Sequence, residues 1–222
     1  MAESPRTTAR TSANGRPRRR MPPEQRRDHL VSTALQLYGH RSPADTSVDD
    51  IVQAAEVSRA LFYRYFGNIR ELHLTALGRV VDELVGQLVV PSTGAFRDDL
   101  RTALDRFLAF AETYAASYTA LLSTGSALAD DSTAPLIRGV RDHAVRQVRD
   151  RLGLAELPGG VERTLRAWMA AVEATVLAWL PAPDVGRGEL GSWLAEQLLA
   201  MLAATARCDA EAAAALPHVL DD

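Results

Sequence analysis

The side chains at residues 58–64 carry groups that could bind nucleic-acid bases and phosphates. Ser58 and Tyr63 offer hydroxyl groups, while Arg59 and Arg64 offer planar guanidinium groups with several donors each. These donors suit phosphate oxygens, and an arginine also fits the edge of a guanine. We expect Arg59 to meet a base edge, and Tyr63 and Arg64 to meet neighbouring phosphates.

A helix that begins after Ser58 would present these side chains on its outer surface. Phe62 and Phe66 lie four residues apart and would face inward, and Ser58 is a favoured residue at a helix N-cap. Before it, apolar residues at helical spacing predict another short helix, and Val57 would fill the turn: Val48, Ile51, Val52, Ala55. Two short helices joined by a tight turn are typical of a helix-turn-helix motif.

The stretch from about Arg26 to Leu77 resembles the N-terminal DNA-binding domain of the TetR family of bacterial regulators. The resemblance lies in Thr46 and Ser47 opening a helix, Asp50-Ile51 within it, residues 55–58 at the turn, and Phe62-Tyr63 with Phe66 closing the recognition helix. It implies binding of double-stranded operator DNA as a homodimer through a predicted set of contacts: Thr46, Ser47, Ser58, Arg59, Leu61, Tyr63, Arg64 and Arg70. Helix capping alone would explain one of Thr46 and Ser47.

Three residues depart from the family pattern. Glu56 stands in the turn where the family usually has Gly, which predicts backbone strain there. Leu61 replaces a small hydroxyl residue and would touch a thymine methyl group instead of forming a hydrogen bond. Ile69 replaces a usual Lys, so a phosphate contact would pass to Arg70 or be lost.

Composition favours a globular, all-α protein. The chain has 222 residues and 24.1 kDa, of which 47% are hydrophobic. Alanine and leucine dominate, and nearly every segment after residue 24 has an apolar period near 3.6. We expect about nine helices: three in an N-terminal helix-turn-helix domain and the others in a larger C-terminal domain for ligand binding and dimerisation.

Charge is distributed unevenly along the chain. Residues 1–72 contain 12 Arg against 8 acidic residues, a net of +4, whereas residues 73–222 contain 13 Arg against 20, a net of −7. This polarity would orient the molecule on DNA and make binding sensitive to salt. Residues 1–21 are predicted to be a disordered basic arm that enters the minor groove. A solvated tail is the alternative, and Met21 would also serve as a first residue.

The expected helices divide the chain into domains. Residues 22–72 would form the helix-turn-helix domain, whose first helix runs from Pro22 to Gly39. Residues 73–207 would form the larger domain, and residues 208–222 a tail. Asn68 would cap a long fourth helix that ends at the break at 91–94, and the further helices are expected at 96–111, 114–122, 136–152, 161–180 and 188–207, with a turn at 157–160 before the last two.

The larger domain contains two sets of apolar residues with different expected roles. By analogy with the family, an effector cavity would be lined by Phe107, Phe110, Tyr114, Tyr118, Trp168 and Val172, with Glu173 or His143 as a polar group. The last two helices carry more apolar residues than one core face needs, which predicts a dimer interface of Leu165, Val176, Trp179, Leu190, Trp193, Leu194, Leu198 and Met201. Packing inside one subunit would also explain both sets.

Other classes of function have little support in the sequence. Cys208 is the single cysteine, the five histidines lack metal-ligand spacing, and no phosphate loop or nucleophile elbow is present, so we expect no metal, no cofactor and no enzyme. No window is long and apolar enough for a membrane helix, and a cytoplasmic location is expected. We expect a regulator, a repressor released by a small hydrophobic or amphipathic ligand. The alternative is a helical ligand-binding or scaffolding protein with weakened DNA binding.

Overall fold

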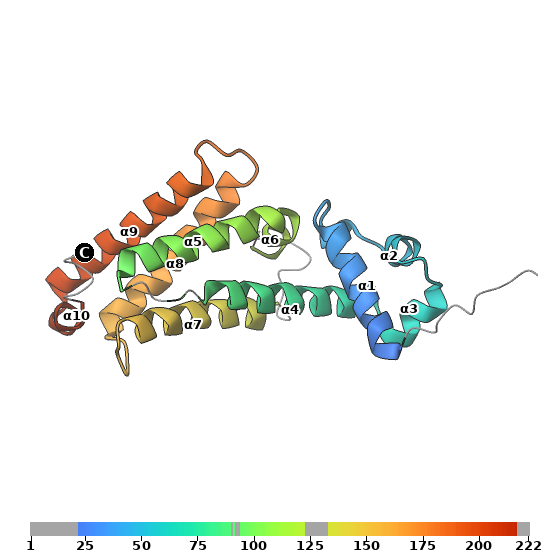
Figure 1. Ribbon diagram of the computed structural model, residues 1–222, viewed down its shortest axis with the longest axis horizontal. Coiled ribbons are helices and arrows are strands. Elements are labelled where there is room, and N and C mark those ends of the chain that lie inside the picture. Colours follow the sequence, from blue (N-terminus) through green and yellow to red (C-terminus); the bar gives the residue numbers. More distant parts are fainter. Residues whose placement is uncertain (1–21, 90, 92–93, 123–132, 217–222) are drawn as a thin grey trace, which may run out of the picture.

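The computed structural model describes residues 22–89, 91, 94–122 and 133–216. Within these residues all regular structure is helical, in the order shown in Figure 1. The described ranges contain ten α-helices and a 3-10 helix η1: α1 (Pro23–Tyr38), η1 (Pro43–Asp45), α2 (Val48–Ala54), α3 (Arg59–Tyr65), α4 (Ile69–Leu88), α5 (Phe96–Thr113), α6 (Ala115–Leu122), α7 (Ala134–Arg151), α8 (Gly159–Trp179), α9 (Arg187–Cys208) and α10 (Ala210–Ala215).

Capping residues set where the first four α-helices begin. Pro22 precedes α1, whose first residue is also a proline. Ser47 and Asp50 form a capping box at α2, in which each side chain accepts a hydrogen bond from the other's backbone N–H. Ser58 caps α3 and Asn68 caps α4. The starts expected at Ser58 and Asn68 are therefore confirmed.

The first helices enclose a core of their own. α1 packs against α2 and α4, and α2 packs against α3. Phe62 and Phe66 are fully buried in this core, with their ring centroids 5.9 Å apart. The other buried members come from α1, α2, α4 and the turn: Leu30, Val31, Ala34, Tyr38, Ile51, Ala55, Leu72 and Ala76. We call residues 22–72 the head.

α4 joins the head to the remaining helices, which we call the body. Figure 1 shows α4 running from beside α1 to a position between α5 and α7. Its first half contributes Leu72 and Ala76 to the head core, and its second half packs Val80 and Leu84 against Phe110 of α5. The largest core lies between α5, α8 and α9. No helix in the described ranges is long and apolar enough to cross a membrane.

Two details of the body differ from the expected elements. Gly159 and Gly160 belong to α8 and not to a turn. A Cβ atom on Gly160 would collide with the side chain of Asp209, so glycine here permits close packing of helices. Asp209 caps α10, a helix within the region expected to be a tail, and Ala212 and Leu216 of that region are fully buried in the body core.

A buried histidine lies where α1 meets α4. The rings of Tyr38 and His73 meet edge to face with centroids 5.4 Å apart, and both side chains are buried. Neither the Tyr38 hydroxyl nor His73 Nε2 has a hydrogen-bond partner. Burial lowers the pKa of His73 from 6.5 to about 4.

We expect His73 to make the fold less stable as the pH falls from 6.5 to about 4. In this window His73 is protonated in the unfolded chain but stays neutral in the folded chain. The free energy of unfolding therefore decreases as the pH decreases. His73→Leu should remove this contribution. In urea unfolding, the midpoint of the variant should rise relative to wild type between pH 7.5 and 4.5; a constant difference would contradict the assignment.

Candidate nucleic-acid interface and ligand cavity

The recognition helix α3 separates its side chains as expected. Ser58 Oγ accepts a hydrogen bond from the N–H of Leu61 at 3.2 Å and thereby sets the start of the helix. Phe62 is fully buried, whereas Tyr63 is 53% exposed and Arg64 is also exposed. The hydroxyl and guanidinium groups of α3 therefore lie on the solvent side, where a duplex could reach them.

Arg59 is held by a neighbour that the sequence did not indicate. Its guanidinium group donates through Nε and Nη2 to the two carboxylate oxygens of Asp49 on α2. Both side chains are more than half exposed, and the hydrogen bond from Arg59 lowers the pKa of Asp49. Exposed pairs of this kind contribute little to stability, because water and salt screen them. The pair orients Arg59 at little cost, and Arg59 can leave Asp49 when a base competes.

The two hydroxyl residues before α2 have different positions. Ser47 is exposed, and its Oγ donates to Asp50 at 2.6 Å. The hydrogen bonds from the side chain and backbone of Ser47 lower the pKa of Asp50 to about 2. Thr46 is only 4% exposed, and its hydroxyl donates to the carbonyl of Ser42 at 3.1 Å. The structure thus contradicts a phosphate contact by the Thr46 side chain, because a hydroxyl buried against the backbone cannot reach DNA.

The remaining predicted contacts lie around the ends of α3. Leu61 is half-buried on α3, and Arg70 is exposed in the first turn of α4. Ile69 is half-buried and packs against the head core together with Tyr65. The side chain that replaces the usual Lys therefore packs inward, which leaves Arg70 as the cation at this helix start.

Glu56 adopts the strained backbone that its position in the turn predicted. Its φ is 53°, the only positive φ of a non-glycine residue in the part of the chain that the structure describes. The N–H groups of Glu56 and Val57 bond to carbonyls of α2, which holds the turn closed. A left-handed conformation costs a residue with a Cβ atom on the order of 1 kcal/mol.

We expect Glu56→Gly to raise the free energy of unfolding by on the order of 1 kcal/mol, because glycine adopts positive φ without the steric penalty. Equilibrium urea unfolding measures the change. Glu56→Ala is the matched control, since it removes the carboxylate but keeps the Cβ atom. An equal gain from alanine would attribute the effect to charge and not to backbone strain.

The positive charge of the N-terminal region comes from residues outside the described part. Residues 22–72 contain six Arg against seven acidic residues, whereas residues 1–21 contain six Arg against one. The predicted basic arm, residues 1–21, lies outside the described residues. The folded head alone has no net positive charge, so any attraction to phosphate depends on where its arginines stand.

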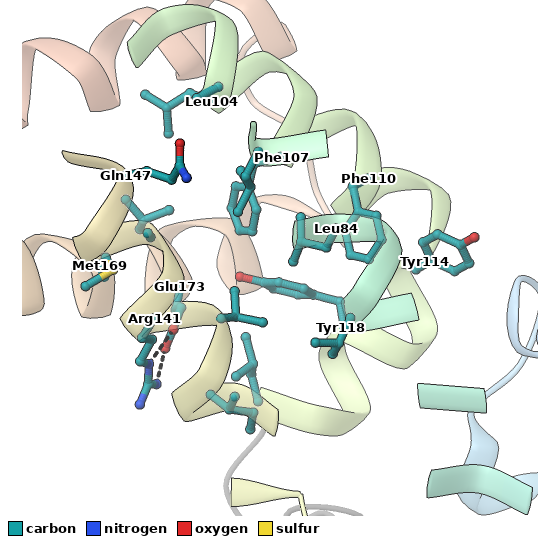
Figure 2. A pocket seen from close by; sticks show the side chains of 18 of the residues that line it. Leu84, Leu104, Phe107, Phe110, Tyr114, Tyr118, Arg141, Gln147, Met169 and Glu173 are labelled. Carbon is teal, nitrogen blue, oxygen red and sulfur yellow. Dashed lines mark hydrogen bonds and ion pairs between the residues drawn. The ribbon is translucent and has the colours of Figure 1, made fainter. Parts of the chain in front are cut away.

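The body contains a cavity of about 210 Å³ between α4, α5, α6, α7 and α8. Figure 2 shows side chains from these helices converging on it. All six residues of the predicted cavity line it: Phe107, Phe110, Tyr114, Tyr118, Trp168 and Val172. Further lining residues that the sequence did not single out come mainly from α4 and α7: Leu77, Val80, Val81, Leu84, Leu88, Ile137, Val140, Ala144 and Val148. Their spacing is that of any core face, so no local signal marks them.

Few polar groups face the cavity. Arg141 of α7 donates through Nε to Glu173 of α8 at 2.8 Å, and through Nη2 to the second carboxylate oxygen. Tyr114 donates to Glu83 at 3.0 Å. Glu173 lines the cavity as expected, but His143 is not among the lining residues.

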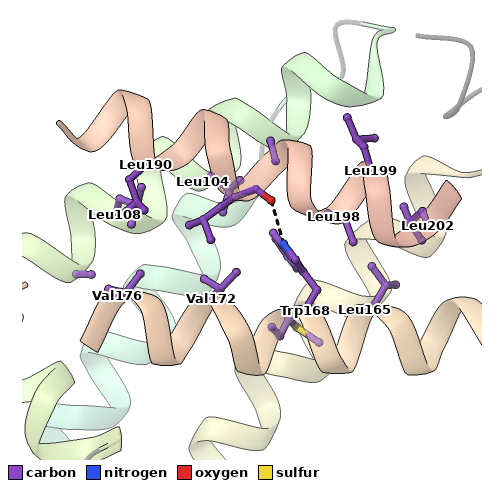
Figure 3. Close-up of a cluster of buried hydrophobic side chains, with 14 of the residues drawn as sticks. Leu104, Leu108, Leu165, Trp168, Val172, Val176, Leu190, Leu198, Leu199 and Leu202 are labelled. Carbon is purple, nitrogen blue, oxygen red and sulfur yellow. Dashed lines mark hydrogen bonds between the residues drawn. The ribbon is translucent and has the colours of Figure 1, made fainter. Parts of the chain in front are cut away.

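Most of the residues predicted for a dimer interface are buried inside one subunit. Figure 3 shows several of them in the core between α8, α9 and α5. Six are at most 5% exposed, so the prediction is wrong for Leu165, Val176, Trp179, Leu190, Leu194 and Leu198. α5 covers one face of α9. This packing explains why the last two helices carry more apolar residues than one core face needs. Trp193 is 50% exposed and Met201 is half-buried, so these two can still meet another subunit.

The outward face of α8 is made largely of small residues, and that of α9 contains two alanines. On α8 the exposed positions recur at helical spacing: Ala167, Ala170, Ala171, Ala174 and Ala178. On α9 the corresponding face consists of Trp193, Gln197, Ala200 and Ala204. Such faces allow two helices to approach closely.

Among the described residues there is no group of three or more metal-ligating side chains.

Comparison with known proteins identifies the family. Residues 30–75 match the model of bacterial regulatory proteins of the tetR family, and residues 96–201 match the tetracyclin repressor-like C-terminal domain. A solved TetR-family transcriptional regulator from Streptomyces coelicolor superposes with a TM-score of 0.86 at 34% identity, over 91% of each chain. The chain belongs to the TetR family. This membership classes it with transcriptional regulators and not with enzymes.

Relatives of this TetR-family chain match it over part of their length. The transcriptional activator FasR of Mycolicibacterium smegmatis is 31% identical over 105 residues, which are 46% of this chain and 48% of FasR. The regulator EthR of Mycobacterium tuberculosis is 43% identical over 54 residues, 24% of this chain and 25% of EthR. FadR from Bacillus halodurans shares the fold with a TM-score of 0.57 at 15% identity, over 78% of this chain and 94% of FadR.

Proposed function

We propose that this protein is a TetR-like repressor that binds operator DNA through α3 and releases it when a small ligand fills the body cavity. The exposed Arg59, Tyr63 and Arg64 on a helix anchored by buried Phe62 and Phe66 support this function most directly. Such a helix can enter a major groove, where Arg59 would meet a base edge and Tyr63 and Arg64 the phosphates. Ser47, Ser58 and Arg70 would add contacts to the DNA at the edges of the surface formed by α3.

We further propose that two copies pair through the outward faces of α8 and α9. The exposed alanines and Trp193 would meet the same faces of a second copy about a twofold axis, which gives an isologous contact. Two recognition helices related in this way require two half-sites, spaced by about 34–36 Å for successive major grooves. A roughly palindromic operator follows from this symmetry.

The ligand would act through α4. Its second half lines the cavity with Val80 and Leu84, while Leu72 and Ala76 of the same helix pack in the head core. A ligand that prefers one position of α4 therefore shifts the population of head positions. A spacing that no longer matches successive grooves would release the DNA.

Retention of genomic fragments, followed by a salt series on the bound operator, tests the DNA-binding function. Arg64→Ala should weaken binding about uniformly across sequences and reduce the salt slope by about 1. Arg59→Ala should also relax base preference by about 1–3 kcal/mol at one position. Asp49→Asn keeps the side-chain shape but removes the negative charge that competes with a base for Arg59, so it should keep base preference and not weaken binding.

A protein that retains no fragment in a sequence-specific manner would instead be a helical ligand-binding or scaffolding protein. Unchanged affinity in both arginine variants would show that α3 is not the recognition helix.

We expect Ala170→Arg to dissociate the dimer. The bulky cation would separate two closely packed copies of α8, because Ala170 lies on its exposed alanine face. Sedimentation measurements should show that the affinity of the two copies for each other falls tenfold or more, which corresponds to about 1.4 kcal/mol. Ala213→Arg, an exposed alanine on α10, is the control and should leave the dimer intact. Dissociation by both variants, or by neither, would contradict the proposed face.

A further inference from the structure

The hydroxyl group of Tyr118 is the one cavity-lining phenol without a partner. Its side chain is 8% exposed, and its oxygen has no hydrogen-bond partner. Figure 2 shows the ring crossing the cavity from α6, with its oxygen directed toward the side formed by α7 and α8. Burial raises the pKa of Tyr118, so the group remains a neutral donor. A buried donor without an acceptor is unfavourable and would be satisfied by an oxygen of a ligand.

The charges on the cavity wall cancel each other. Arg141 directs two donors at Glu173, whose side chain is only 20% exposed. A ligand carboxylate at the remaining donors of Arg141 would lie beside the negative charge of Glu173, and displacing Glu173 would leave a mostly buried acid unpaired. A ligand cation would have to displace Arg141 from the same acid. The pair therefore disfavours both kinds of ion.

We propose that the cavity binds an uncharged, mainly hydrocarbon molecule whose single carbonyl or ether oxygen accepts a hydrogen bond from Tyr118. This assignment rests on the proposed function of the cavity as an effector site. The volume of about 210 Å³ is below the usual range of about 300–1,000 Å³ for ligand pockets, which favours a small molecule. The walls of leucine, valine and phenylalanine suit its hydrocarbon part.

Three probes of similar length test this assignment: decan-2-one, decane and ionised decanoate at pH 8. Trp168 lines the cavity, so its fluorescence provides the titration signal. Wild type should bind the ketone about two- to tenfold more tightly than decane, as expected for one hydrogen bond, and decanoate most weakly. Tyr118→Phe should lose this preference and bind the alkane more tightly than the ketone, because the buried ketone oxygen would then have no donor.

Tyr38→Phe is the matched control. Tyr38 also has a buried hydroxyl without a hydrogen-bond partner, but it does not line this cavity. This variant should keep the preference for the ketone. Because Tyr118→Phe removes only an unpaired buried hydroxyl, its melting temperature should equal or exceed that of wild type, which separates a lost hydrogen bond from a lost fold.

Three results would overturn the assignment: a retained ketone preference in Tyr118→Phe, tighter binding of decanoate than of the ketone, or no binding of any probe. Operator retention without a probe is measured on the same samples. Loss of DNA binding with an intact ketone preference counts against the DNA-binding function alone, and the reverse pattern counts against the ligand class alone.

Discussion

The architecture depends on one helix being shared between two hydrophobic cores. Leu72 and Ala76 of α4 are fully buried among α1 and the helix-turn-helix, whereas Val80 and Leu84, one to two turns later, face α5 and the cavity. Packed interiors transmit displacement because they contain little free volume. A shift of α4 would change packing contacts in both cores. This constraint makes a cavity in the body relevant to the exposed surface of α3 in the head.

A second connection between head and body runs through α6. Ser117 lines both the ligand cavity and a small cavity of about 20 Å³ that also borders Tyr38, Pro43 and His73. α6 packs against η1, the 3-10 helix that leads into α2. Tyr118, the neighbour of Ser117, carries the unpaired hydroxyl. A ligand oxygen bound to Tyr118 would lie on the side of the cavity formed by α7 and α8, while the helix that carries Tyr118 also contacts the head.

Local rules predicted the head well because its elements are specified by short-range interactions. Ser58 and Asn68 cap the helices that they were expected to cap, and Glu56 has the positive φ that its place in the turn requires. The same rules could not reveal that Thr46 is buried against Ser42 or that Asp49 holds Arg59. The contact between Asp49 and Arg59 forms only when α2 and α3 pack together, and the contact between Thr46 and Ser42 forms across the 3-10 helix η1, which was not expected from the sequence.

The sequence by itself determined the all-α class and the helix-turn-helix, since apolar periodicity and capping are properties of neighbouring residues. The aromatic residues of the cavity were expected from the resemblance to the TetR family. Tertiary structure decided which apolar face meets which helix. Leu194 and Leu198 were as compatible with a second subunit as with their own, and α5 and α8 bury them within the chain. Periodicity shows that a face must be covered, but not by what, because the hydrophobic effect has no direction.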